Sequence, residues 1–197
     1  MKKFTFLLLL FPFCYSTSYA QLGIRAGLNL TNISGDTEDL GDALKSATGY
    51  QIGLTYNLPL TNSLSIRPGA LYTVKGFGTE ILDIEAKAKF NYIEIPIDIV
   101  LGLFDTGVFG IDLHGGPYLG YMSSAKNELD GDSEDVDFEE SGLNRNDIGL
   151  NLGATVNFSG LYIGLNYGLG LSNLNSDLDD SLKNTNVSLI AGYTFGG

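Results

Sequence analysis

An acidic run carries the densest set of side chains in the chain that could bind a ligand. Residues 128–140 read ELDGDSEDVDFEE and hold eight acids and no base. The acids that could bind a cation weakly are Asp130, Asp132, Glu134 and Asp137. The first three alternate as the first ligands of a calcium loop do. However, Asp135 stands where such a loop needs glycine, and its twelfth position is Ser141. Weak Ca²⁺ binding and a solvated, self-repelling acidic loop are therefore both open.

Residues for nucleophilic catalysis are scarce. The chain has one histidine, His114, and its single cysteine, Cys14, lies in an N-terminal segment that is expected to be removed. An acyl-transfer site would have to centre on His114, because a serine nucleophile needs an adjacent base. The pair Gly168 and Gly170 lacks the strand-to-helix context of a phosphate loop. We therefore expect no enzymatic activity and no cofactor.

The elements that position these residues show a strict alternation of side chains. Residues 161–172 read LYIGLNYGLGLS, with Leu, Ile or Tyr at every odd position and mostly Gly, Asn or Ser at the even ones. A period of two indicates a β-strand with two unlike faces. On a soluble protein the second face would meet water, and a row of glycines there would weaken the strand. The second face must instead need small residues.

Eight segments share this pattern. They lie at residues 23–30, 49–57, 63–76, 90–100, 108–122, 147–158, 161–172 and 186–195. Their connections alternate between long ones, near 31–48, 77–87, 123–145 and 173–184, and short ones, near 58–62, 102–106 and 159–160. Short turns on one rim and long loops on the other are typical of outer-membrane barrels. The sequence therefore predicts an all-β fold, an eight-stranded antiparallel up-and-down transmembrane β-barrel whose small residues line a narrow lumen.

The N-terminus predicts export. Lys2 and Lys3 precede an apolar run at residues 4–13, and small residues lead to Ala20. This is the pattern of a secretory signal peptide, and the run is about half the length of a membrane-spanning helix. We expect two segments, a signal peptide at residues 1–20 and an outer-membrane β-barrel domain at residues 21–197.

The charge of the chain narrows its partners. Removing residues 1–20 takes away two of the 11 Lys and Arg and no acid, which leaves nine against 23 Asp and Glu, a net charge of −14. Strong acidity argues against nucleic acid as a partner. Residues 21–197 contain no apolar run of about 18 residues, so a barrel is the remaining way to span a membrane. The expected location is the outer membrane.

Several charged residues fall on the lumen face. Pairing about residue 82 places Arg67 opposite residues 94–98, and the short turn near 102–106 brings Asp98 beside Asp112. Arg25, near the same rim, could reach across a narrow lumen. Buried charges are tolerated when they are paired, so we expect a structural salt-bridge network. Its members are Arg25, Arg67, Glu94, Asp98 and Asp112. The alternative is a binding or proton-relay site.

Four segments carry a family resemblance. FNYIEIPIDIV, GGPYLGYM, NDIGLNLGATV and AGYTF, in this order, resemble the outer-membrane β-barrel domain family that includes PorT-like proteins. The resemblance covers residues 21–197, and NYIEIP followed by GGPYLGY is its most specific part. It implies a barrel in a Gram-negative outer membrane. Most members have no assigned activity; PorT-like members are linked to a secretion and gliding apparatus, and nothing here singles out that branch.

We therefore expect a small outer-membrane barrel whose exposed acidic loops contact an envelope protein, a surface or an ion. A small channel or transporter is an alternative, disfavoured because side chains fill a lumen of this size. A lipid-modifying enzyme is another. It is disfavoured because His114 falls on the lumen face, whereas such barrels carry His and Ser at the lipid-facing rim. A soluble lipocalin-like barrel would need a polar exterior.

Overall fold

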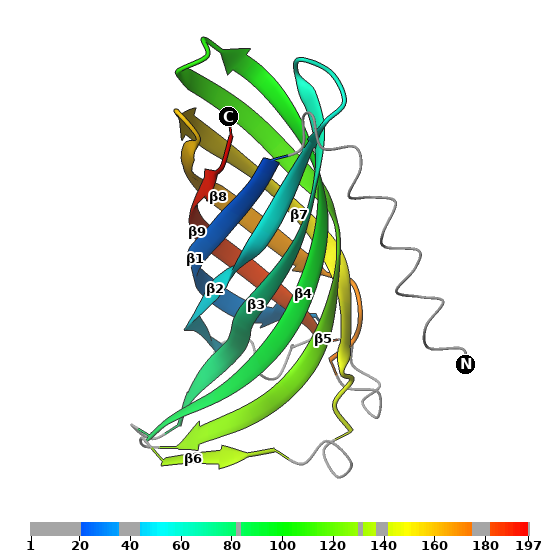
Figure 1. The fold of residues 1–197 in the computed structure, drawn as a ribbon. Helices are drawn as coiled ribbons and strands as arrows, with labels where there is room; N and C mark the ends of the chain where they lie inside the picture. The colour runs from blue at the N-terminus through cyan, green and yellow to red at the C-terminus, as the bar shows by residue number, and fades with distance from the viewer. Residues whose placement is uncertain are drawn as a thin grey trace, which may run out of the picture.

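The computed structural model of the protein describes residues 21–35, 44–81, 84–129, 132–136, 142–174 and 182–196. This part of the chain forms one antiparallel β-sheet that closes on itself as a barrel (Figure 1). It contains no helix that is long and apolar enough to cross a membrane. The proposed signal peptide lies outside the described residues and stays a prediction.

The ring is built from strands that each pair with the next barrel strand along the chain. The strands are β1 (Gln21–Ser34), β2 (Leu44–Pro59), β3 (Leu64–Ile81), β4 (Ile84–Asp105), β5 (Phe109–Leu129), β6 (Asp132–Asp135), β7 (Asn146–Phe158), β8 (Leu161–Gly170) and β9 (Lys183–Thr194). Pairing of β1 with β9 closes the ring. The short β6 pairs with the far end of β5, beyond the part of β5 that pairs with β7. β1–β5 and β7–β9 thus confirm the predicted eight-stranded antiparallel up-and-down barrel.

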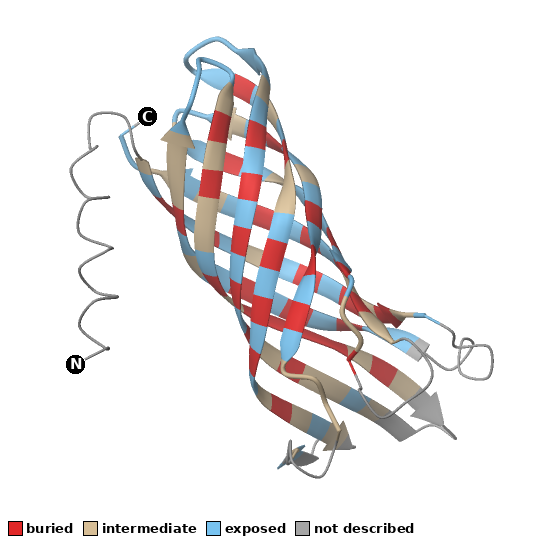
Figure 2. Cartoon of the chain, turned by 90° about the vertical axis from the view of Figure 1, so that its right-hand side faces the viewer, coloured by how far each residue is buried: buried red, intermediate tan, exposed pale blue. Residues whose placement is uncertain are grey.

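The two faces of the wall differ as the alternation predicts. In β8, Leu165 is 60% exposed on the outside, whereas its neighbour Asn166 is 7% exposed and points inward. Figure 2 shows the same exchange of buried and exposed residues along the other strands. Large apolar side chains cover the outside of the ring. Exposing so large an apolar belt to water would be unfavourable for a monomer, so this outer face contacts lipid.

The small inward residues make room for large ones. His114 on β5 is paired directly with Gly153 on β7, and Tyr162 on β8 with Gly192 on β9. A β-carbon at either glycine would overlap the ring that faces it. The row of glycines is therefore needed so that a narrow lumen can hold aromatic side chains.

One rim of the barrel has only tight connections, and we call it the short-turn rim. It contains residues 60–63, 106–108 and 159–160, and β1 begins and β9 ends there (Figure 1). Ser159 and Gly160 both have positive φ, 48° and 85°. Two such residues form the type I′ turn that matches the twist of a β-hairpin. We call the opposite rim the long-loop rim.

Residues 77–87, expected to be a long loop, are instead mostly strand. β3 continues to Ile81, β4 begins at Ile84, and these two residues are paired. The apolar alternation fades here because the outer face carries charged residues such as the exposed Lys87. The inner face, which is polar closer to the short-turn rim, is apolar here, with the ring centroids of Phe77 and Phe90 6.1 Å apart. Sequence reasoning that relied on apolar outward residues could not detect this part of the strands.

Candidate functional site

A buried ion cluster lies in the lumen on the side of the long-loop rim. It consists of Lys75 on β3, Glu94 on β4 and Asp147 on β7, and we call it the distal cluster. Each member lies eleven positions from the end of its strand at the short-turn rim. Lys75 Nζ is 2.8 Å from Glu94 Oε2 and 3.1 Å from Asp147 Oδ2. One cation therefore joins two carboxylates across the lumen.

Polar and aromatic side chains complete the distal cluster. Asn184 Nδ2 donates to Asp147 Oδ2 at 3.0 Å, and Ser172 Oγ donates to Asp147 Oδ1 at 3.2 Å. Lys75 Nζ also lies 4.2 Å from the ring centroid of Tyr118 and 5.3 Å from that of Tyr92. These contacts link β3, β4, β5, β7 and β9, so the cluster ties most of the ring together.

A second group of charges lies closer to the short-turn rim. Arg25 on β1, Arg67 on β3 and Asp98 on β4 are all buried, and we call them the proximal cluster. Arg25 Nη2 is 3.2 Å from Asp98 Oδ2. Arg25 Nε donates a long hydrogen bond, 3.5 Å, to the hydroxyl oxygen of Tyr162. This ion pair crosses the lumen between strands that are not neighbours in the ring.

Arg67 is the unusual member of the proximal cluster. Its Cα is paired with that of Asp98, which lies within the expected stretch 94–98, yet the carboxylate of Asp98 binds Arg25. The guanidinium of Arg67 lies over the ring of Tyr162, 5.5 Å from its centroid. Its Nε and Nη1 have no hydrogen-bond partner, although the side chain is buried. Buried N–H donors without hydrogen bonds are costly, so this group is suited to a partner from outside the chain.

The expected single network is thus divided into two. Glu94 pairs with Lys75 in the distal cluster and not with Arg67. Asp112 is paired in register with Gly102 and not with Asp98, and its Oδ2 accepts a hydrogen bond from Asn157 Nδ2 at 2.7 Å. Sequence reasoning missed Lys75 and Asp147 as members. Both are inward by parity, but only the closed ring brings β7 opposite β3.

His114 lies on the lumen face, which confirms its expected orientation. It is buried, and its Nε2 is 3.1 Å from Asn166 Oδ1. Its hydrogen-bond partners among the described residues include no serine. This environment is that of a packed polar side chain on the inside of the barrel.

The acidic run is described only in part. Asp130 and Asp137 lie outside the described residues, and Asp132 and Glu134 belong to β6, paired with β5. Within the described segments no three His, Cys, Asp or Glu side chains gather as metal ligands. Calcium binding by this run stays a prediction.

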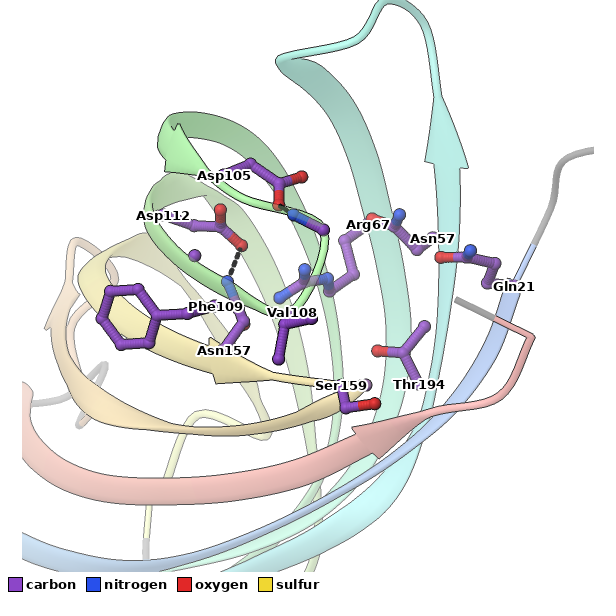
Figure 3. Close-up of a pocket in the computed structure, with 13 residues that line it drawn as sticks. Gln21, Asn57, Arg67, Asp105, Val108, Phe109, Asp112, Asn157, Ser159 and Thr194 are labelled. Carbon is purple, nitrogen blue, oxygen red and sulfur yellow. Dashed lines mark hydrogen bonds between the residues drawn. The ribbon is translucent and has the colours of Figure 1, made fainter.

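A cavity opens at the short-turn rim. Its volume is about 430 Å³, and Figure 3 shows Arg67 reaching into it from β3, opposite Asp112 and Asn157. Asp105 and Val108, from the β4–β5 turn region, lie at its edge. The cavity therefore borders the proximal cluster at Arg67, the cation whose Nε and Nη1 lack hydrogen-bond partners among the described residues.

Three solved structures have similar folds. Neisserial surface protein A is 16% identical, with a TM-score of 0.51, and the match covers 90% of this chain and 100% of that one. The outer membrane enzyme PagL is 14% identical, with a TM-score of 0.50 and coverage of 87% and 98%. The attachment invasion locus protein Ail of Yersinia pestis, solved with the heparin analogue sucrose octasulfate, is 21% identical, with a TM-score of 0.47 and coverage of 89% and 99%. At these identities the likeness concerns the fold alone.

The sequence comparison is more specific. No curated protein sequence matches the chain significantly. The family model of the outer membrane protein beta-barrel domain matches residues 11–176, which is most of the chain. The match does not distinguish a PorT-like branch, which stays a prediction. With its closed eight-stranded ring and apolar outer belt, the chain belongs to the outer membrane protein beta-barrel domain family.

Proposed function

We propose that this protein is a non-enzymatic outer-membrane barrel that contacts an envelope or surface partner through strands projecting from the membrane. These strands, which we call the extracellular wall, are residues 76–81 of β3, 84–91 of β4 and 122–129 of β5, together with β6. In outer-membrane barrels the short turns lie in the periplasm and the longer connections lie outside. The wall would therefore face away from the cell.

The length of the wall strands carries this proposal. A tilted strand crosses the bilayer in about 9–11 residues. β8 and β9 have 10 and 12 residues, whereas β4 and β5 have 22 and 21. In Figure 1 the far ends of the β4–β5 hairpin, together with β6 and the end of β3, reach well beyond the remaining strands. About half of this hairpin is therefore not needed to span the membrane.

The extracellular wall is packed, which supports a binding role. A buried apolar cluster lies against its inner face, formed by Ile33, Phe90, Tyr92, Met122, Ala125 and Leu174. Phe77 on β3, Ala88 on β4 and Val136, which directly follows β6, pack on this cluster. A surface that is already ordered loses little conformational entropy when it binds a partner.

The chemistry of the wall favours a polar, anionic partner. Lys45, Lys87 and Lys89 line a hollow of about 370 Å³ together with Glu128. Lys89 Nζ is 2.7 Å from Glu128 Oε1, and both side chains remain about one-third exposed, 34% and 28%. Three lysines in one hollow are unusual in a chain with a net charge of −12. They offer charge-assisted hydrogen bonds to phosphate, sulfate or carboxylate groups.

Site-specific photocrosslinking on intact cells tests this function. A photoreactive amino acid is placed at Asn127, exposed on the wall, and as a control at Thr61, exposed on the short-turn rim. We expect a discrete crosslinked product from position 127 that is reduced by Lys87→Gln with Lys89→Gln. No discrete product from position 127, or the same product from position 61, would overturn the proposal.

Two other functions have their own tests. The ion clusters that cross the lumen support a closed barrel, so steady conductance in planar bilayers would argue for a channel. The buried, inward His114 supports a non-enzymatic role. A lipid modification in cells that disappears with His114→Ala would argue for an enzyme instead.

A further inference from the structure

The cavity at the short-turn rim has the properties of a binding site, and it is separate from the extracellular wall. Its volume of about 430 Å³ falls in the range of small-molecule sites, roughly 300–1,000 Å³. Gln21, Asn57 and Asn157 contribute amide groups to its lining. These side chains come from β1, β2 and β7, so the site exists only in the closed barrel.

Arg67 gives this cavity a positive anchor. The side chain is 6% exposed and comes from β3, and in Figure 3 its guanidinium points into the space in front of Asn157 and Asp112. Among the described residues Arg67 has no ion pair, and the carboxylate of Asp98 is paired with Arg25. Its Nε and Nη1 donate no hydrogen bond. A guanidinium with N–H donors that lack partners fits a carboxylate, which accepts charge-assisted hydrogen bonds.

Two aspartates on the opposite side of the cavity indicate that the ligand also carries a positive charge. Asp112 accepts a hydrogen bond from Asn157, and Asp105 Oδ1 accepts one from the backbone N–H of Gly107 at 2.6 Å. Each of these carboxylates still carries negative charge, which would repel a simple anion. A ligand that also carries an ammonium group would instead be attracted to them.

We propose that this cavity binds a small zwitterion of the α-amino-acid type at the periplasmic end of the barrel. The ligand carboxylate lies on the guanidinium of Arg67, and the ligand ammonium lies on Asp112 with Asp105 beyond it. The side-chain amides of Gln21 and Asn57 hydrogen-bond the remaining polar atoms of the ligand. The site does not depend on the extracellular wall, so either proposal can fail without the other.

Titration of the folded protein in detergent micelles, followed by the amide NMR signals of Gly107 and Gly110, tests this site. The probes are L-alanine, propionate, which lacks the ammonium group, and isopropylamine, which lacks the carboxylate. We expect saturable shifts with L-alanine, and binding of the other two that is weaker by about tenfold or more, since each loses a charged hydrogen-bond pair. No saturable shift with L-alanine, or equal affinity for propionate, would overturn the proposal.

Variants locate the ligand within the cavity. Arg67→Gln should abolish saturable binding of L-alanine, whereas Arg145→Gln, which removes an arginine far from the cavity, should leave it unchanged. Asp112→Asn should weaken L-alanine but not propionate. This second variant keeps the test valid if Arg67→Gln does not fold. Unchanged binding of L-alanine to folded Arg67→Gln protein, or equal weakening of both probes by Asp112→Asn, would contradict the assigned site.

Discussion

The two charge clusters of the lumen differ in how completely their cations are paired. In the distal cluster, Lys75 faces both Glu94 and Asp147. In the proximal cluster, one carboxylate, that of Asp98, serves Arg25 and leaves Arg67 without an ion pair in the described structure. The same narrow lumen thus holds one closed cluster and one open cluster. Whether a cluster is closed or open depends on how many carboxylates contact its cations, and not on burial alone.

The surroundings of the clusters follow the same division. The distal cluster is covered by the rings of Tyr92 and Tyr118, which are buried. The proximal cluster borders the cavity at the short-turn rim. A closed cluster can only stabilise the fold, whereas an open one beside a cavity can also bind a ligand. Stability measurements can separate these two roles.

Removal of the distal cation should have the largest effect. Lys75→Met leaves two buried carboxylates facing each other, and loss of one partner from a buried ion pair costs about 3–5 kcal/mol. The free energy of unfolding, measured with urea in lipid vesicles, should fall by this amount. Lys87→Met, on the exposed wall, is the matched control and should change little. A loss equal to that of the control would show that the distal cluster does not stabilise the barrel.

A charge introduced on the lipid face gives a reference loss of unfolding free energy with which the effects at both clusters can be compared. Leu165→Arg places a cation in the apolar belt, which costs about 2–4 kcal/mol near the middle of the bilayer. Asn166→Ser, one residue away and inside the lumen, should cost little because it keeps a small polar group there. Both are measured by urea unfolding in vesicles. Equal effects would mean that the two faces of β8 are assigned wrongly.

Removal of the paired proximal cation should have an intermediate effect. Arg25→Met takes away the ion pair of Asp98, and a hydrogen bond to a charged group contributes about 1.5–3 kcal/mol. The loss should be smaller than for Lys75→Met, because Arg67 is directly opposite Asp98 and can replace Arg25. The double variant Arg25→Met with Arg67→Met should therefore lose more than the two single losses added together. Additive losses would contradict this replacement.

Removal of the unpaired cation should have the smallest effect. Arg67→Met deletes a buried charge that has no ion pair in the described structure, so unfolding should change by no more than about 1 kcal/mol, in either direction. The same urea titration measures it. A loss as large as that of Lys75→Met would show that Arg67 is paired within the fold and not held ready for a ligand.

The sequence by itself determined the faces and the number of barrel strands. A β-strand places successive side chains on opposite faces, so Leu165 and Asn166 were assigned to lipid and lumen from their order alone. The same parity placed His114 inside. These features are local, because they depend on side chains one or two positions apart. The extent of β3–β5 was not predicted, since the far ends of these strands lack apolar side chains at outward positions such as the exposed Lys87.

Only the tertiary structure decided which charges meet. Ladder pairing placed Arg67 opposite residues 94–98, which include its partner Asp98, yet the carboxylate of Asp98 binds Arg25, which comes from a strand on another part of the ring. Lys75 meets Asp147 although 72 positions separate them. In a narrow closed barrel, long side chains reach across the lumen, so the nearest opposite charge is set by the height that strand tilt and stagger give each residue. That height is a property of the whole ring, and no single strand encodes it.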